Sequence, residues 1–575
     1  MKKLRNTVKT AIIARVLLLA SVMLMATPFQ PAQAQLAPKQ PTSSPPSGVT
    51  PNATVHTLAM LSFRPNPIGL NQIFLVNLWT APAPGANRKH WNYTVTITKP
   101  DGSKDVIVMD SYVADGTAWF EYIADQEGEW KIKFEFYGTY YPAGRYYNGY
   151  IVTNTSGTLY TTSAYYQPAS TPEQTLIVKK DYVALSWPSS PLPTDYWARP
   201  ISPENREWWS ILGNYPWNGQ APGPFGERAL EIWDELYPGC NKYWNPRQFF
   251  TPYVQGPTSP HIVWKRQVDL GGLIGGAFGL EYFTWSVGGG NKPAIIFQGR
   301  CYHTVTKPFN GKVQTVWQCY DLRTGEVYWE QIGVPSPTVI EYSVAAETVP
   351  GEQPRRQTPY LLYIGGGYLI KYHPFTGAVT GNYSISPLTT GTYYRNGYVL
   401  SVQTIGTKYY LINWTTIGTA TTLKSRIITN ITWPLNTLPG AVDFSVNIAV
   451  NVAGITVGGA YVGQNITAYD LKTGAKLWSN VIDEPVYNPS CNVADHGKVA
   501  ILTANGYYLG FDLQSGNQVW KSDTMDYPWD AASFGPYGVQ SAYGMFFREA
   551  YSGVYAFNWT NGKIAWKFEA PALFP

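Results

Sequence analysis

The sequence predicts an all-β protein in which a β-propeller follows a smaller β-sandwich. One observation is a short turn motif that returns several times in the C-terminal half of the chain. A second is that short stretches of alternating apolar and polar residues, separated by turns rich in Pro and Gly, fill both halves. The third is composition, because 15% of the 575 residues are aromatic and only 14% are charged. Such a balance favours β-strands over helices.

The fullest copy of the repeat spans residues 468–478 and reads Ala-Tyr-Asp-Leu-Lys-Thr-Gly-Ala-Lys-Leu-Trp. Asp is expected to cap a tight turn, Gly to adopt the positive φ, and Trp to lie on the following strand. The same pattern returns, in full or in part, every 40–50 residues or so. The repeat residues are Asp321, Gly325, Trp329, Asp470, Gly474, Trp478, Asp512, Gly516, Trp520, Gly562 and Trp566.

A single unit of this length cannot bury both faces of its sheet, whereas four-stranded sheets stacked around an axis can. We therefore expect each repeat Trp between two neighbouring sheets, with its indole N–H bonded to a carbonyl group. Strand positions equivalent to the repeat Trp occur at Trp264, Trp329, near 383, near 426, and at Trp478, Trp520 and Trp566. The six intervals between them indicate six blades. Residues 568–571 read as the first strand of another unit, so we expect a truncated ring of seven or eight blades, with closure by six as the alternative.

Residues 468–478 match in full the motif Ala-x-Asp-x-x-Thr-Gly-x-x-x-Trp of the PQQ-like (pyrroloquinoline-quinone-like) β-propeller family, which the chain resembles over residues 261–575. The resemblance implies the propeller fold, but enzymes and binding scaffolds share the motif. It implies that an enzyme of the family would hold PQQ with a vicinal Cys pair, a Trp, an Arg and Ca²⁺. The chain has no vicinal Cys pair, no Cys-x-x-Cys-His and no metal-spaced His pair. We therefore expect no cofactor, with PQQ and Ca²⁺ as the alternative.

The N-terminus is typical of an export signal. Basic residues precede the apolar run of residues 16–25, and Ala32-Gln33-Ala34 offers small residues for cleavage after Ala34. We expect residues 1–34 to be a signal peptide, with an uncleaved anchor as the second choice, because the run is short for a bilayer of about 30 Å. Residues 35–54 are rich in Pro and Ser and are expected to form a flexible stalk. No transmembrane helix is expected in the mature chain.

Residues 55–183 contain short alternating runs with turns such as Lys99-Pro100-Asp101-Gly102, which predict the sandwich and resemble immunoglobulin-like accessory modules. Residues 184–260 form a connector rich in Trp and Pro. We expect this connector to pack as a belt against one of the two domains, and a binding site for a sugar or a partner is the alternative.

Charge and cysteine content narrow the function further. The 42 basic and 37 acidic residues show no long runs, which argues against nucleic-acid binding.

Cys301 and Cys319 flank one predicted hairpin and are either a disulfide or two buried thiols. Acidic pairs in predicted loops, such as Glu341 with Glu347, lack the spacing of a calcium loop. Export makes glycosylation possible at the Asn-x-Ser/Thr sites of Asn52, Asn92, Asn154, Asn382, Asn430 and Asn465, whereas Asn413 and Asn558 fall on repeat strands.

These observations favour an exported non-enzymatic scaffold at the cell surface, outside the cell or in a periplasm-like space. Its propeller face would bind a protein or a glycan. The alternative is a quinoprotein-like oxidoreductase that binds PQQ and Ca²⁺.

Overall fold

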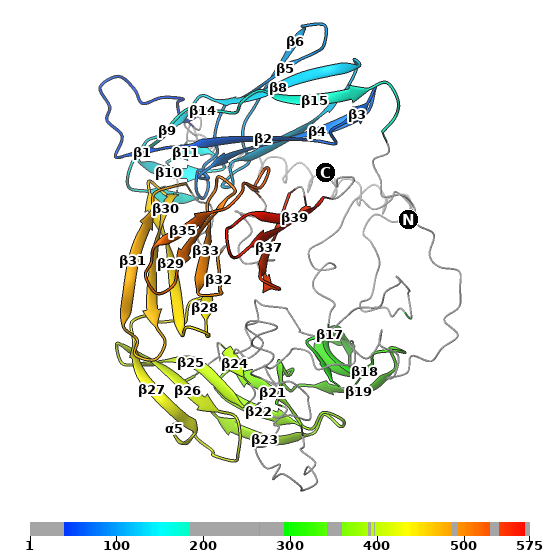
Figure 1. Cartoon of the computed structure of the whole chain (residues 1–575), viewed down its shortest axis with the longest axis vertical. Helices are drawn as coiled ribbons and strands as arrows, with labels where there is room; N and C mark the ends of the chain where they lie inside the picture. The colour runs from blue at the N-terminus through cyan, green and yellow to red at the C-terminus, as the bar shows by residue number, and fades with distance from the viewer. Residues whose placement is uncertain are drawn as a thin grey trace, which may run out of the picture.

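The computed structural model is an all-β structure in which a β-sandwich lies against a series of four-stranded blades (Figure 1). It describes residues 39–153, 155–183, 264, 293–297, 299–341, 359–388, 393–395, 397–485, 492–529, 540–551 and 553–569. The predicted signal peptide, the connector 184–260, Asn154 and Glu347 lie outside these residues.

Two sheets form the sandwich. The order β3-β15-β8-β5-β6, with β14 beside β8, makes one sheet, and β2-β4-β7 makes the other. The strands are β2 (Leu58–Arg64), β3 (Ile68–Gly69), β4 (Ile73–Ala81), β5 (Tyr93–Thr98), β6 (Lys104–Met109), β7 (Thr117–Ile123), β8 (Gly128–Phe136), β14 (Ala169–Ser170) and β15 (Gln174–Lys179).

The core of the sandwich follows from the alternation along these strands. Phe74, Val76 and Leu78 of β4 are fully buried, and they share one apolar core with Trp130 and Ile132 of β8. The residues between them, from Ile73 to Trp79 in steps of two, face the opposite side of the sheet. The two-layer sandwich is therefore present, and its immunoglobulin-like type remains a prediction.

Two small sheets complete the N-terminal domain. The order β1-β13-β9 makes one and β11-β10-β12 the other, with bounds β1 (Ala53–Val55), β9 (Thr139–Tyr141), β10 (Gly144–Tyr147), β11 (Tyr150–Val152), β12 (Thr158–Tyr160) and β13 (Ala164–Tyr166). The residues expected to form a flexible stalk lie along this part, since Lys39 bridges to Ile151 and the Tyr140 N–H donates to the Thr42 carbonyl at 2.6 Å. Residues 39–54 are thus attached to the domain, contrary to the expectation.

The remaining strands form six successive four-stranded antiparallel sheets within the described residues, the blades of a β-propeller. Blade 1 contains β16 (Ile295–Phe297), β17 (Arg300–Phe309), β18 (Lys312–Asp321) and β19 (Val327–Ile332). Blade 2 contains β20 (Val339–Glu341), β21 (Tyr360–Gly365), β22 (Tyr368–Tyr372) and β23 (Val379–Ser384). Blade 3 contains β24 (Tyr393–Arg395), β25 (Tyr398–Ile405), β26 (Lys408–Thr415) and β27 (Ile427–Trp433), with the short helix α5 (Leu423–Arg426) before β27.

The last three blades have the same order. Blade 4 contains β28 (Ala441–Asp443), β29 (Ile448–Val457), β30 (Ala460–Asp470) and β31 (Lys476–Ile482). Blade 5 contains β32 (Asn492–Asp495), β33 (Lys498–Leu502), β34 (Tyr508–Asp512) and β35 (Gln518–Lys521). Blade 6 contains β36 (Gln540–Ala542), β37 (Met545–Ala550), β38 (Gly553–Asn558) and β39 (Ile564–Glu569).

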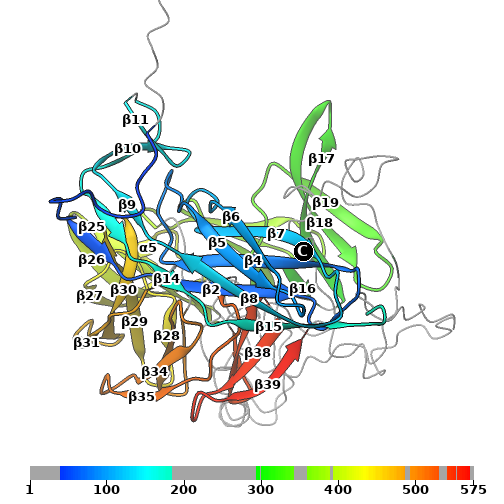
Figure 2. The same ribbon diagram turned by 90° about the horizontal axis from the view of Figure 1, so that it is seen from above.

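Antiparallel order gives every blade two different ends. The turns after the first and third strands lie at one end, and the turn after the second strand lies at the other, together with the link to the next blade. We call the turn after the second strand the second turn and the turn after the third strand the third turn. The sandwich lies across blades 4, 5 and 6, as the view from above also shows (Figure 2).

Candidate functional site

The third turns carry the repeat motif and join the blades. The Asp470 carboxylate accepts hydrogen bonds from the N–H groups of Lys472 and Thr473, each at 2.8 Å, and Gly474 has φ +75°. Burial raises the pKa of Asp470, but the bonds from Thr473 and Lys472 outweigh it, so this pKa lies below its ordinary value. Asp321, Asp512 and Asn558 cap their turns in the same way. These polar residues are therefore committed to turn geometry.

Three of the four motif Trp residues insert into the third turn of the next blade, whereas Trp566 is 44% exposed. The indole N–H of Trp329 donates to Phe375 O at 2.8 Å, that of Trp478 to Leu513 O at 2.7 Å, and that of Trp520 to Trp559 O at 3.0 Å. A Cβ atom built on Gly377, Gly516 or Gly562 would lie 2.6–2.7 Å from the indole of the preceding blade. Glycine is thus required twice, for its positive φ and for the close approach of the Trp.

The joint between blades 2 and 3 departs from this rule. Strand register places Lys371 and Gly381 where blade 4 has Ala468 and Trp478, and it places Asn413 and Thr429 there in blade 3. The Trp-type positions expected near 383 and 426 are therefore occupied by Gly381 and Thr429. In blade 2 the large side chain at this pair of positions is Lys371 of the third strand, and the fourth strand has Gly381.

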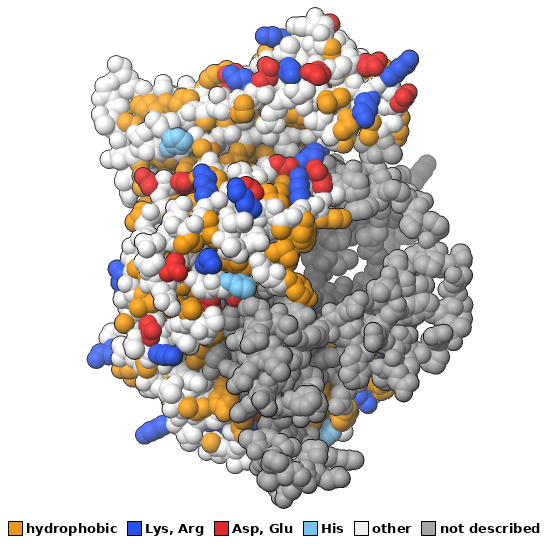
Figure 3. Space-filling view, viewed as in Figure 1, with side chains coloured by type: hydrophobic (Ala, Val, Ile, Leu, Met, Phe, Trp, Pro, Cys, Tyr) orange, Lys and Arg blue, Asp and Glu red, His pale blue; other side chains and the backbone are white. Residues whose placement is uncertain are grey.

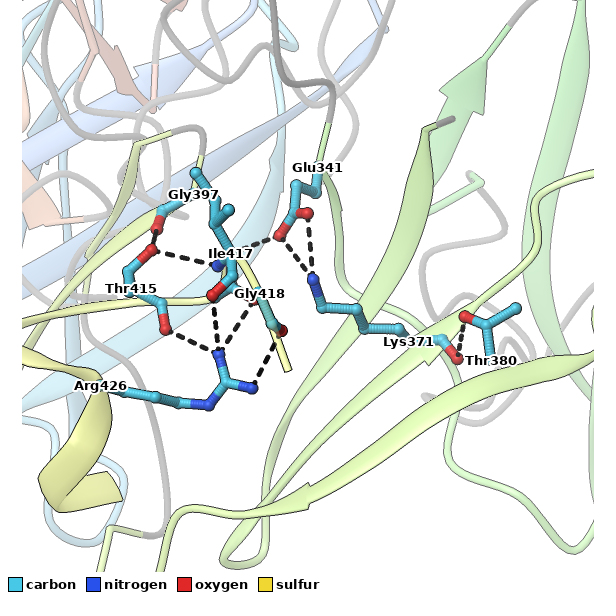
Figure 4. A network of polar contacts seen from close by, with 9 residues as sticks. Glu341, Lys371, Thr380, Gly397, Thr415, Ile417, Gly418 and Arg426 are labelled. Carbon is cyan, nitrogen blue, oxygen red and sulfur yellow. Dashed lines mark hydrogen bonds and ion pairs between the residues drawn. The ribbon is translucent and has the colours of Figure 1, made fainter. Parts of the chain in front are cut away.

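A buried polar network replaces the Trp at this joint (Figure 4). The Lys371 ammonium lies 3.1 Å from Glu341 Oε1, and the side chains are 7% and 5% exposed. Thr416 of blade 3 donates its hydroxyl to the other oxygen of Glu341. Glu341, expected in a loop, thus lies on the first strand of blade 2 and is neutralised by Lys371.

Arg426 completes the network from the blade 3 side. Its Nη1 donates to the carbonyl oxygens of Thr415, Thr416 and Ile417 at 3.1–3.2 Å, and its Nη2 to Gly418 O at 3.3 Å. The guanidinium also lies 4.6 Å from the centre of the Tyr383 ring of blade 2. Burial lowers the pKa of Arg426. This side chain closes the stretched third turn of blade 3 and places its guanidinium against Tyr383 of blade 2, so the network joins the two blades.

The second turns of blades 4 and 6, and the link between blades 5 and 6, meet the N-terminal domain. Arg88 is fully buried, its Nη1 donates to Gly458 O at 2.9 Å, and its guanidinium lies 3.5 Å from the centre of the Tyr160 ring. A Cβ atom on Gly458 would lie 2.6 Å from the Cβ of Ala164. The glycine turn therefore lets the two domains approach closely, while Arg88 contacts both.

Blades 5 and 6 continue this interface. Trp79 of β4 is fully buried against Tyr527, with ring centres 6.5 Å apart, and Asn77 Nδ2 donates to Tyr551 Oη at 2.6 Å. Arg64 forms ion pairs with Asp526 at 2.7 Å and Glu569 at 2.9 Å. Charged side chains of both signs gather along the line where the sandwich meets the blades (Figure 3).

The equivalent turns of blades 1 to 3 are exposed. Phe309 and Val313 at the second turn of blade 1 are 40% and 74% exposed, Tyr368 of blade 2 is 51% exposed, and Ile405 of blade 3 is 53% exposed. Phe309 pairs with Lys312, and Ile405 pairs with Lys408, so two turns combine an apolar residue with a lysine. Neither lysine has an ion pair within the part of the chain that the structure describes. We call these three turns the open turns.

The structure does not join Cys301 to Cys319. Cys301 pairs in register with Tyr320, and Cys319 with Tyr302, so the two sulfur atoms lie on opposite faces of the β17–β18 hairpin. Successive side chains alternate across a sheet, so a bond between them would require a change of register. The disulfide alternative is wrong for this structure, and burial raises the pKa of the Cys319 thiol.

The predicted glycosylation sites are surface positions where the structure describes them. Asn52, Asn92, Asn382, Asn430 and Asn465 are exposed. Asn413 is only partly exposed, and its side-chain oxygen is buried. Glycosylation at the five exposed asparagines remains a prediction.

Among the described residues no group of three or more His, Cys, Asp or Glu side chains is arranged to hold a metal ion. No helix among them is long and apolar enough to cross a membrane.

Comparison with known proteins agrees with the blade architecture. Residues 312–568 match the family model described as "Outer membrane protein assembly factor BamB". This segment comprises blades 2 to 6 and the last two strands of blade 1. The chain therefore contains a PQQ-like repeat propeller over these residues. No curated protein sequence matches the chain.

Solved structures with similar segments share little sequence with the chain. BamB from Moraxella catarrhalis is 13% identical, with 47% of this chain and 71% of that chain covered and a TM-score of 0.27. Quinohemoprotein alcohol dehydrogenase from Comamonas testosteroni is 12% identical, with coverage of 48% and 60% and a TM-score of 0.26. The computationally designed protein Ika8 is 13% identical, with coverage of 47% and 86% and a TM-score of 0.25.

Sequence reasoning found the third turns and their Trp residues, and it missed the domain interface and the polar joint. Arg64 and Arg88 belong to no repeat, and Lys371 stands where another copy of the repeat has Ala468, so no sequence pattern distinguishes the three from surface cations. The sequence does show that blade 2 lacks the repeat Trp. Because another side chain must then fill that space between the blades, the missing Trp could have pointed to Lys371.

Proposed function

We propose that the protein is a non-enzymatic scaffold of the cell envelope that binds another protein through the open turns of blades 1 to 3. The observation that carries the proposal is the contrast between equivalent turns. The N-terminal domain contacts the second turns of blades 4 and 6 and the link between blades 5 and 6, whereas the second turns of blades 1 to 3 expose Phe309, Val313, Tyr368 and Ile405. Apolar side chains gathered at the same topological position on neighbouring blades support a docking surface.

The open turns favour a partner with apolar and acidic side chains. Lys312 and Lys408 each lie directly across the turn from an apolar residue. Aromatic and aliphatic anchors with a charged rim are typical of protein interfaces. A protein is therefore the better choice of the two partner classes, since residues 312–568 also match a family described as a protein assembly factor.

Location in the envelope is supported by two independent features. One is the predicted export signal at residues 1–34. The other is the match of residues 312–568 to a family whose description names an outer-membrane assembly factor. An oxidoreductase is less well supported, because no vicinal Cys pair exists in the sequence and the polar network at Glu341 is neutralised internally.

The test compares charge substitutions at the open turns of blades 1 and 3 with charge substitutions on the outer strand of blade 4. Phe309→Asp and Ile405→Asp alter the open turns, and Leu477→Asp and Val481→Asp alter similarly exposed residues on the outer strand of blade 4. Each full-length variant is used to isolate partners from the native envelope. We expect the first pair to lose a protein partner by at least about tenfold, consistent with hot-spot losses of 2 kcal/mol or more, and the second pair to retain it.

Equal retention by all four variants would contradict the proposal. Turnover of an alcohol by the purified protein with added PQQ and Ca²⁺ would favour the oxidoreductase instead.

A further inference from the structure

We propose that two copies of the protein pair through β6, an edge strand of the sandwich, and so form an antiparallel dimer with one continuous sheet. Within the described residues β6 pairs with β5 on one side and with no strand on the other. It lies at the top of the view in Figure 1, on the side of the sandwich away from the blades. The contact is therefore separate from the open turns and goes beyond the proposed function.

The outer face of this sheet shows how β6 differs from its neighbours. On this face β5 places Thr94, Thr96 and Thr98, and each of them pairs in register with a charged residue of β8. On the same face β6 places Val106 and Val108, which are 60% and 59% exposed. An exposed apolar edge strand is a template for pairing with another chain.

The backbone of β6 turns its outward groups to solvent at the same residues. The Lys99 N–H donates to Ser103 O at 2.9 Å, which makes these two residues a hydrogen-bonded pair at the end of the β5–β6 hairpin. In an antiparallel ladder such pairs recur at every second residue. The odd-numbered residues of β6 therefore turn their N–H and C=O groups toward β5, whereas Lys104, Val106 and Val108 turn theirs away from it. The exposed valines thus carry the backbone groups that a further strand would bind.

The order of side chains identifies the further strand as β6 of a second copy. A two-fold axis through Ile107 places Val106 of each copy opposite Val108 of the other, and Lys104 opposite Asp110, the residue that follows β6. All four belong to the outward-facing set, so the two strands can exchange hydrogen bonds at these positions. In this register β6 is complementary to itself both in apolar groups and in charge.

The neighbouring registers are poorer. An axis through Val106 would place Lys104 opposite Val108, and an axis through Val108 would place Val106 opposite Asp110. Each of these arrangements sets a charged group against an apolar one and loses both Lys–Asp pairs. An axis between two residues would set outward backbone groups opposite inward ones. A strand of an unrelated protein would match this order of charged and apolar residues only by chance.

The two charged groups are available for this contact. Lys104 is exposed and has no ion pair within the described residues. The Asp110 carboxylate is bound by the Lys89 ammonium at 3.0 Å and by the Asn92 N–H at 3.2 Å, and its side chain is 34% exposed. These contacts hold Asp110 at the end of β6 and leave part of its carboxylate open to a second cation.

The contact is small, which determines how it is measured. Pairing through one strand of six residues buries far less than a standard interface of about 1,600 Å². We therefore expect a reversible dimer whose fraction rises with protein concentration. Sedimentation velocity of the full chain over a wide range of concentrations measures its dissociation constant.

Substitutions on β6 test the contact against a matched control. Val108→Asp is compared with Ile177→Asp, because Ile177 is 45% exposed on the outer face of the same sheet but lies on β15, which has a strand on each side. We expect Val108→Asp to weaken dimerisation by at least about tenfold and Ile177→Asp to leave it unchanged. Lys104→Glu should weaken it several-fold, since it sets like charges opposite each other.

Val106→Pro tests the backbone directly. Proline is tolerated where an edge strand turns its N–H outward, so the variant should keep the monomer fold, as thermal unfolding will show. It removes a donor from the paired strands, and we expect dimerisation to weaken by at least about tenfold.

The register has its own test in a mixture of Val106→Cys and Val108→Cys proteins, treated with an oxidant. Residues opposite each other in a hydrogen-bonded pair have Cα atoms about 5.5 Å apart, within the reach of a disulfide. The mixture should therefore give a cross-linked peptide that joins the two positions. Val106→Cys alone should give several-fold less, because its two copies lie out of register and beyond the limit of about 7 Å.

Three outcomes would overturn the inference. They are a monomer at every concentration, a dimer that withstands both Val106→Pro and Val108→Asp, and cross-linking by Val106→Cys alone that equals that of the mixture. Phe309→Asp at the open turns should leave the dimer unchanged, so failure of the proposed function and failure of this dimer are distinguishable.

Discussion

Two kinds of contact join neighbouring blades. Comparing them shows that buried charged residues can take the place of the repeat Trp between two blades. At the joints from blade 1 to 2, 4 to 5 and 5 to 6, an indole on one fourth strand fits a glycine turn on the next blade. At the joint from blade 2 to 3, Lys371, Glu341, Thr416 and Arg426 make the contact through charges and carbonyl groups. The first kind depends on shape, and the second depends on a buried ion pair and hydrogen bonds. They should therefore fail in different ways.

The largest effect is expected from Glu341→Ala, which leaves the Lys371 ammonium buried without a counter-ion. We expect a loss of about 3–5 kcal/mol in the free energy of unfolding, measured by chemical denaturation, as for other broken buried pairs. Glu330→Ala is the matched control, because its pair with Lys307 is 29% and 33% exposed. That control should cost about 1 kcal/mol or less. Similar losses in both variants would remove the distinction between the joints.

The shape-dependent joint is tested by Gly516→Ala. Gly516 has φ +75°, and its Cβ would lie 2.6 Å from Trp478. The conformational cost of about 1–2 kcal/mol for a left-handed residue adds to the cost of displacing the indole, for a total of about 3 kcal/mol. Gly544→Ala separates the two costs, since Gly544 has φ +72° and open space around the same position. If both variants lose the same stability, the indole does not require glycine.

The polar joint has a second test in Arg426→Leu. The substitution leaves the carbonyl groups of Thr415 to Gly418 without the Arg426 donor, and we expect a loss of about 1–3 kcal/mol. Hydrogen exchange should increase first in the third turn of blade 3, while the turn at Gly516 stays protected. Uniform exchange across both turns would indicate that the joints do not open independently.

The N-terminal domain should differ from the blade joints in its dependence on pH, because it buries the histidine His90. Burial, together with the nearby Arg88, lowers the pKa of His90 to about 3. The unfolded chain binds a proton near pH 6.5 and the folded chain does not, so stability should be highest above pH 6.5. It should fall by about 1.4 kcal/mol per pH unit between 6.5 and 3 through this group. His90→Gln should remove that part of the slope, and an unchanged slope would show that His90 is accessible to protons.

The features that the sequence predicts are those that depend on residues within a single repeat unit. The Asp–Gly turns, the strand after them and the Trp position all follow from interactions within one unit, so Asp470, Gly474 and Trp478 were identified before the structure. The partners of these residues lie in other units. Gly381 and Thr429 illustrate the limit, because only strand register shows which residues replace the Trp in blades 2 and 3.

The domain interface could not be predicted for a similar reason. Arg88 contacts Gly458, 370 positions away in the chain, and neither residue lies in a pattern that links the two domains. Cys301 and Cys319 were close in sequence, yet the register of one hairpin separates them. Contacts between domains and the register of paired strands depend on how the folded blades stack. Composition and periodicity do not determine this stacking.

The Trp–glycine contact also gives the array a direction. Every standard unit offers a protruding indole on its trailing side and a recess on its leading side, so whole units can be duplicated or lost by recombination while the remaining units still match. Blades 2 and 3 are the exception, because their charged groups fit only each other and must be inherited as a pair. A lineage of such proteins should therefore vary in length at the Trp–glycine joints and not at the joint between blades 2 and 3.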